Sequence, residues 1–140
     1  MPVPLTASGA PWAQELPPLR VDEAWARRVV REHFGLDVEA RSLGSQQDAN
    51  FVLVAASGEA AGSVVAVLKA THPVTSTTEV EAADEAADRI AERCPDLRVA
   101  TVLRDGAGRP QRHLVDSPDG PLTARLLRHL AGGTVVDDGY

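Results

Sequence analysis

A chain of 140 residues, 44% of them hydrophobic, has the size of one ordinary domain with a single core and leaves no room for a second catalytic domain. The formal net charge of −6, with no arginine cluster longer than Arg27-Arg28, argues against nucleic acid or an anionic membrane as the main partner. No window holds 18 apolar residues, the N-terminal 20 residues are broken by prolines, and a single cysteine fits a reducing compartment, so a cytoplasmic protein is expected.

The first half of the chain predicts an arm, a helix and three strands. Residues 1–21 are proline-rich and are expected to form an extended arm. Asp22 is a plausible N-cap for a helix from about Glu23 to His33, which Gly35 would end in a left-handed turn. Period-two patterns then predict strands at 40–43, 51–55 and 63–70. These three strands are expected to form an antiparallel meander.

The second half predicts one long helix followed by two or three strands. Ser76-Thr77-Thr78-Glu79 has the form of a capping box and opens a helix that runs to about Arg93. Turn residues then separate possible strands at 98–103, 112–115 and 122–130. The expected apolar face of the helix, which would bury the cysteine, is formed by Val80, Ala83, Ala87, Ile90 and Cys94.

The order of these elements predicts an α+β fold. An antiparallel sheet of about five strands would pack against the 77–93 helix, with the N-terminal helix in addition. We expect the domain to span residues 22–135 and residues 136–140 to form a tail or the start of a linker.

Lys69 is the most informative single residue, because every other member of the 14 lysines and arginines is arginine. It ends the apolar run that begins at Val64. An ammonium is a compact point charge on a flexible stem, suited to reaching phosphate oxygens from a strand. The alternative is an ordinary strand-end lysine whose stem covers apolar surface while its head stays in water.

Strand, loop, strand, a third strand ending in lysine, a helix and then two more strands is the plan of a kinase N-terminal lobe. Short motifs make the likeness more specific, and they resemble the small lobe of the aminoglycoside phosphotransferase family, closest to its hydroxylysine-kinase-like branch. The resemblance covers about residues 22–135 and includes a Ser-x-x-Asp-x-Asn-Phe loop between the first two strands. The segments that carry it are Phe34-Gly35-Leu36, Leu43 to Phe51, Val67-Leu68-Lys69, His72-Pro73, Leu97 to Val102 and Ala124 to Gly132.

The resemblance implies an ATP-binding role for the strand that ends in Lys69. Lys69 would neutralise the α- and β-phosphates of the nucleotide. Strand alternation places Val65 and Val67 on the same face as Lys69, where they could cover an adenine ring.

Four further positions take expected roles from the family. Ser45 and Asn50 would lie in the loop over the phosphates, although this loop lacks the G-x-G-x-x-G pattern of protein kinases. The hinge of the family offers backbone groups to the adenine edge, and here these would belong to Arg128 and Leu130.

Two departures from the family pattern bear on catalysis. The helix after the lysine strand normally supplies a carboxylate or amide to the lysine, and the matching position here is Ala83. Glu81 and Glu85 point away from the apolar face, and only Glu79 and Asp84 border it, so the partner of the lysine is left open. The family's catalytic base and magnesium-binding aspartate belong to a C-terminal lobe that these residues do not include. Residues 1–140 alone are therefore expected to transfer no phosphate.

Three hypotheses about the function of the domain remain open. The first is the nucleotide-binding N-terminal lobe of a small-molecule kinase, part of a longer multidomain enzyme, with a C-terminal lobe or a second copy of the chain as partner. The second is a non-catalytic kinase-lobe-like interaction or regulatory domain, which could stand upstream of a pyridoxal-phosphate aminotransferase domain. The third is an α+β binding domain whose likeness to the lobe is accidental. The spacing of the four histidines predicts no zinc site.

Overall fold

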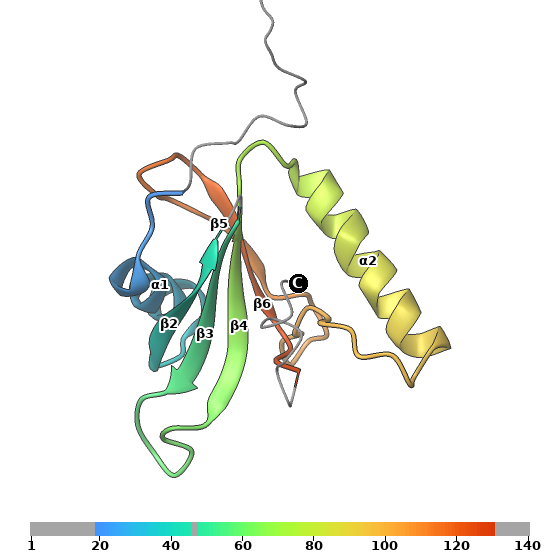
Figure 1. The fold of residues 1–140 in the computed structure, drawn as a ribbon, viewed down its shortest axis with the longest axis horizontal. Coiled ribbons are helices and arrows are strands. Elements are labelled where there is room, and N and C mark those ends of the chain that lie inside the picture. The colour runs from blue at the N-terminus through green and yellow to red at the C-terminus, as the bar shows by residue number, and fades with distance from the viewer. Residues whose placement is uncertain (1–18, 46–47, 131–140) are drawn as a thin grey trace, which may run out of the picture.

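The computed structural model describes residues 19–45 and 48–130 and contains a five-stranded antiparallel sheet with a helix on each face (Figure 1). The predicted α+β class and sheet are thereby confirmed. The strand that comes last in the sequence is inserted between the two strands that precede it in the sequence. The spatial order is β2 (Val38–Ser45), β3 (Ala49–Ala55), β4 (Val64–Thr71), β6 (Leu122–Leu127) and β5 (Arg112–Val115).

The N-terminal helix begins at the predicted Glu23 and ends at Phe34, one residue beyond the predicted end. Helix α1 (Glu23–Val29) continues into a single π-helical turn, η2 (Val30–Phe34). Asp22 is the N-cap, and its carboxylate accepts a hydrogen bond of 2.8 Å from the backbone N–H of Trp25. Gly35 ends the turn with φ at 71°, a left-handed conformation that glycine adopts without steric cost.

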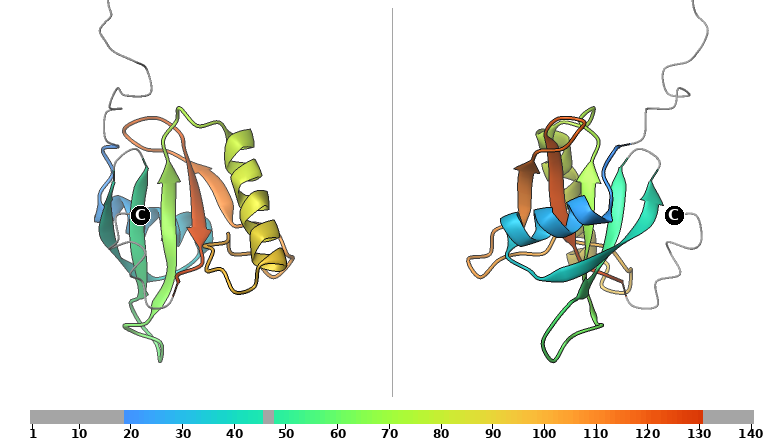
Figure 2. Two further views of the ribbon diagram at one scale, coloured as in Figure 1. Left: turned by 45° about the vertical axis from the view of Figure 1, so that its right-hand side comes forward. Right: turned by 90° about the vertical axis from the view of Figure 1, so that its left-hand side faces the viewer.

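The hydrophobic core lies between α1 and one face of the sheet. In Figure 2 the 90° view shows α1 crossing this face while α2 lies on the other side. Trp25 packs against Phe51 with ring centroids 6.4 Å apart, and its indole N–H donates to the carbonyl of Asp116 at 3.0 Å. The sheet contributes large, fully buried side chains to this core, among them Phe51, Leu53, Leu68, Leu122 and Leu126.

Helix α2 (Thr77–Arg93) has the predicted bounds, and the predicted capping box forms at its start. The Ser76 hydroxyl accepts from the N–H of Glu79 at 3.1 Å, and the Glu79 carboxylate accepts from the N–H of Ser76 at 3.0 Å. The backbone hydrogen bond from Ser76, assisted by its side chain, holds the pKa of Glu79 below its usual value.

The expected apolar face of α2 is correct only in part: Val80 is buried and Ala87 is partly buried, but the other three positions are exposed. Val80 and Asp84 are the buried residues of the helix, whereas Ala83 and Cys94 are exposed and Ile90 is 43% exposed. Alanine methyl groups offer little apolar area to bury, so charge pairing outweighs them here. The helix has turned Asp84 towards the sheet.

The strand expected at 98–103 is also absent. This segment contributes a single bridge, between Val102 and Leu127, and β6 ends at Leu127 where the sequence suggested residue 130. Its backbone still follows β6, since the N–H of Leu103 donates to Leu126 and the N–H of Arg128 donates to Thr101, both at 2.8 Å. The strand predicted at 112–115 is confirmed as β5.

The packed region includes residues that the sequence assigned to the arm. Leu19 is 8% exposed and belongs to the core. Arg20 binds Asp119 through its backbone N–H at 2.6 Å and its Nε at 3.1 Å, and the backbone bond is the main cause that lowers the pKa of Asp119. The rest of the proposed arm, residues 1–18, and the tail at 136–140 lie outside the described residues.

Among the helices of the described part of the chain, none combines the length and the apolar character that a membrane crossing needs.

Candidate functional site

Four polar side chains form a row across the face of the sheet that is turned to α2. The strand register places Asn50 opposite Lys69, Lys69 opposite Arg125, and Arg125 opposite Arg112. Directly opposed residues have Cβ atoms about 4.5–5.5 Å apart, and like charges at that distance repel. This cross-strand row, Asn50-Lys69-Arg125-Arg112, therefore needs carboxylates close by.

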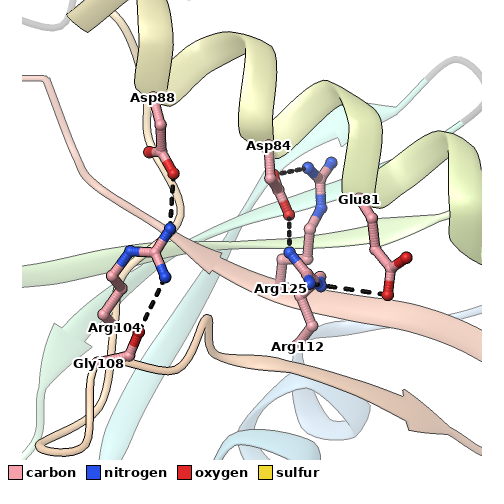
Figure 3. Close-up of polar contacts among 7 residues, drawn as sticks. All are labelled: Glu81, Asp84, Asp88, Arg104, Gly108, Arg112 and Arg125. Atoms are coloured by element: carbon pink, nitrogen blue, oxygen red, sulfur yellow. Dashed lines mark hydrogen bonds and ion pairs between the residues drawn. The ribbon is translucent and has the colours of Figure 1, made fainter. Parts of the chain in front are cut away.

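Asp84 of α2 supplies the first carboxylate. Its Oδ1 accepts from Arg125 Nη1 at 2.5 Å and its Oδ2 from Arg112 Nη1 at 2.8 Å, so both oxygens are engaged. Figure 3 shows Asp84 pointing from the helix towards the two guanidinium groups. Asp84 is 4% and Arg125 7% exposed, and charges so deeply buried are tolerated only when paired. Glu81 adds a looser contact of 3.8 Å with Arg112 at the rim.

A second ion pair connects α2, one turn after Asp84, to the segment that contains Arg104. Asp88 accepts from Arg104 Nη2 at 2.7 Å, and Arg104 Nη1 also donates to the carbonyl of Gly108 at 2.8 Å. The Asp88 and Arg104 side chains are 28% and 46% exposed, so water screens this pair more than the Asp84 pairs. Ion pairs thus join α2 to β5 and β6 and to the segment around Arg104.

Lys69 takes its carboxylate from the loop between β2 and β3. Its Nζ lies 3.8 Å from Asp48 Oδ2, and the other oxygen of Asp48 accepts from the N–H of His72 at 2.9 Å. The sequence left this partner open and considered Glu79 and Asp84, which are engaged in the capping box and with the arginines. Asp48 was part of the family-like motif, but no role followed from its position there.

The three β4 residues assigned to nucleotide binding share one face of the sheet. The exposed or partly exposed residues Val65, Val67 and Lys69 alternate with the fully buried Ala66, Leu68 and Ala70. Val67 lies opposite the partly buried Leu127 of β6. Next to the ammonium there is therefore an apolar strip formed by Val65, Val67 and Leu127.

The four other expected site residues lie at different places in the sheet and beyond the end of β6. Asn50 is opposite Lys69, and the backbone of Ser45 pairs with Ala49 at the end of β2. Arg128 and Leu130 follow β6 at the Val67 end of the strip. The N–H of Arg128 donates to Thr101, so within the fold this hinge donor is already used.

The charges around the row balance. Its four salt bridges join the cations Lys69, Arg125 and Arg112 to the carboxylates Asp48, Asp84 and Glu81. An incoming phosphate therefore gains little from a net local field and depends on direct contact with the ammonium. Lys69 can make such a contact because its side chain is 33% exposed.

One signal in the sequence could have revealed the arginines. Arg125 interrupts the otherwise apolar or small run Leu122–Leu127, and a charge inside a buried strand calls for a buried partner. Within residues 19–45 and 48–130 there is no group of three or more metal-ligating side chains.

Comparison of the chain with family models, with curated proteins and with solved structures found no match.

Proposed function

We propose that this domain binds ATP as the nucleotide-binding lobe of a small-molecule phosphotransferase, with Lys69 as its phosphate ligand. The observation that carries the proposal is the surroundings of the chain's one lysine. It is partly exposed on a sheet face, with Asn50 opposite it and an apolar strip further along its own strand. A nucleotide needs this combination, because its phosphates require a cation and its base requires apolar contact.

The spacing along β4 suits a ligand with one charged and one flat apolar end. Val65 and Lys69 are four positions apart, which at the rise per residue of a strand corresponds to about 13 Å. Phosphates at the Lys69 end would leave the base beside Val65 and Val67, near the segment that follows β6. The carbonyl of Arg128 and the backbone of Leu130 are the groups that we assign to the edge of the base.

Transfer of phosphate needs groups that the described residues do not bring together. A catalytic base and magnesium ligands of the kinase type would have to come from a C-terminal lobe, and no metal-ligating cluster exists in the described residues. With half of the contacts missing, the dissociation constant for ATP is expected to be about millimolar, roughly −4 kcal/mol.

The lysine itself provides the test. Because Lys69 is the only lysine, a sample labelled with ¹³C-lysine gives a single ε-methylene signal that needs no assignment. ATP should shift this signal with an affinity near millimolar, whereas adenosine should shift it little. In Lys69→Met the ATP-induced changes in the amide spectrum should disappear while the fold is kept, since methionine preserves the packing of the stem.

Arg31→Met is the matched control, because Arg31 is an exposed cation in η2, on the opposite face of the sheet. It should bind ATP like the unchanged protein. A folded protein whose lysine signal ignores ATP, or a Lys69→Met variant that binds ATP normally, would overturn the proposal.

The arrangement of α2 favours the non-catalytic module as second candidate. Asp84 gives both carboxylate oxygens to arginines, so the helix offers its buried carboxylate to the sheet and not to Lys69. An interaction domain would use only the surface of the lobe to bind its partner and would not require Lys69 to bind a phosphate. The same ATP titration separates the two candidates, because such a module would show no response at Lys69.

Self-association is expected from the apolar residues on the open face. Val65 is 38% and Leu114 65% exposed, and the register places both on the side of the sheet that carries Lys69. Sedimentation velocity should show a weak dimer that grows with concentration and diminishes in Val65→Ser. Val74→Ser, which changes a 62% exposed residue outside the sheet, is the control and should leave the dimer unchanged. A strict monomer at high concentration would contradict this expectation.

A further inference from the structure

Asp48 is held in a fixed place beside the end of β4. The N–H of His72, three positions after Lys69, donates to its Oδ1 at 2.9 Å, and its Oδ2 then faces Lys69 Nζ at 3.8 Å. The carboxylate belongs to the loop before β3, whereas both partners belong to the end of β4 and the residue after it. Asp48 therefore has a backbone anchor that does not involve the lysine, and its second oxygen is left to face the ammonium.

The pair is too open to be explained by stability. The Lys69 and Asp48 side chains are 33% and 25% exposed, and ion pairs in such surroundings contribute little to folding. A lysine has three donors and a mobile stem, and one carboxylate at the limit of contact restricts the stem while leaving donors for a phosphate. The geometry therefore suits a role in positioning the ammonium better than a role in stabilising the fold.

Helix α2 cannot take this role in the observed arrangement. Both oxygens of Asp84 are bound by arginines, and Glu79 closes the capping box. In the part of the chain that the structure describes, Asp48 is the acidic residue that pairs with Lys69.

We propose that Asp48 is the positioning residue of Lys69 and that this carboxylate just before β3, not a side chain of helix α2, sets the place of the ammonium for a nucleotide phosphate. This inference rests on the proposed function of Lys69. The opposite hypothesis is that the Asp48 carboxylate repels the phosphate and weakens its binding. The sign of the effect of neutralising Asp48 distinguishes the two.

Asp48→Asn is the decisive variant, because its amide oxygen can still accept from His72 while the charge is lost. Without ligand, the ε-methylene signal of ¹³C-lysine should move towards the position of a free lysine. ATP should bind about tenfold more weakly, and adenosine should bind as before. Asp48→Glu keeps the charge on a longer stem and should recover part of the affinity. Glu32→Gln removes an exposed carboxylate of η2, on the opposite face of the sheet, and should change neither readout.

The outcomes separate this inference from the function on which it rests. If the folded, unchanged protein shows no ATP response, both proposals fall. If it binds ATP and Asp48→Asn binds equally well or more tightly, or if the lysine signal does not move in the variant, only the role of Asp48 is overturned. Should Asp48→Asn disturb the amide spectrum beyond the loop, the comparison of Asp48→Glu with the unchanged protein decides, and equal ATP affinity there would overturn the role of Asp48.

Discussion

Replacing Asp84 by asparagine is expected to lower the free energy of unfolding by about 3 kcal/mol. The substitution keeps the shape of the side chain but removes the only negative charge bound to Arg125 among the described residues, and Arg125 is 7% exposed. Arg112 keeps only the looser contact with Glu81. A buried cation without a partner is costly, so α2 should separate from the sheet more readily. Equilibrium unfolding in urea, read by circular dichroism, measures the change.

Asp88→Asn is the matched control on the same helix. It breaks the pair with Arg104, whose side chains are 28% and 46% exposed, and such pairs contribute about 0–1 kcal/mol. If both substitutions cost equally little, the helix is held by apolar contact and our description of the α2 interface is wrong. A stabilised Asp84→Asn would show that the desolvation of the charges outweighs their pairing.

Replacing Leu126 by alanine is expected to cost about 3 kcal/mol, whereas the same change at the next residue, Leu127, should cost about 1 kcal/mol. Leu126 is 0% exposed in the core against α1, and its removal leaves a cavity that the packed neighbours cannot fill. Leu127 is partly buried and points to the other face, opposite Val67. The pair compares the two faces of one strand with identical chemistry.

Urea unfolding of both variants measures this difference. Similar losses at the two positions would mean that the face under α2 is packed as well as the core face, which would leave no room there for a ligand. A larger loss at Leu127 would contradict the assignment of the core to the α1 side.

Local signals predicted most of the fold. The start of α2 followed from the capping box at Ser76 and Glu79, whose two hydrogen bonds are both local in sequence. The orientation of α2 did not follow, because Asp84 is placed by Arg112 and Arg125, 28 and 41 positions away. Helical periodicity cannot compare an ion pair at that separation with the small apolar contacts of two alanines.

The candidate site, too, could be predicted from the sequence only in part. Strand alternation alone put Val65, Val67 and Lys69 on one face, and the structure has them there. The pairing of Lys69 with Asp48 depends on the register that sets Asn50 opposite Lys69. Once the register is known, Asp48 lies two residues before Asn50 and next to the ammonium, but the sequence does not fix a register across a loop of that kind.

The position of β6 between β4 and β5 has a consequence for how the chain folds. The β2-β3-β4 meander is built from neighbours in sequence, whereas the pairing of β4 with β6 must wait until α2 and β5 have been passed. Any intermediate that has the meander but not β6 presents β4, with its run of valines, as an open edge. The single charge of Lys69 is the only one along that strand. The residue proposed to bind phosphate in the native state is therefore also the one that opposes edge-to-edge association before the sheet is complete.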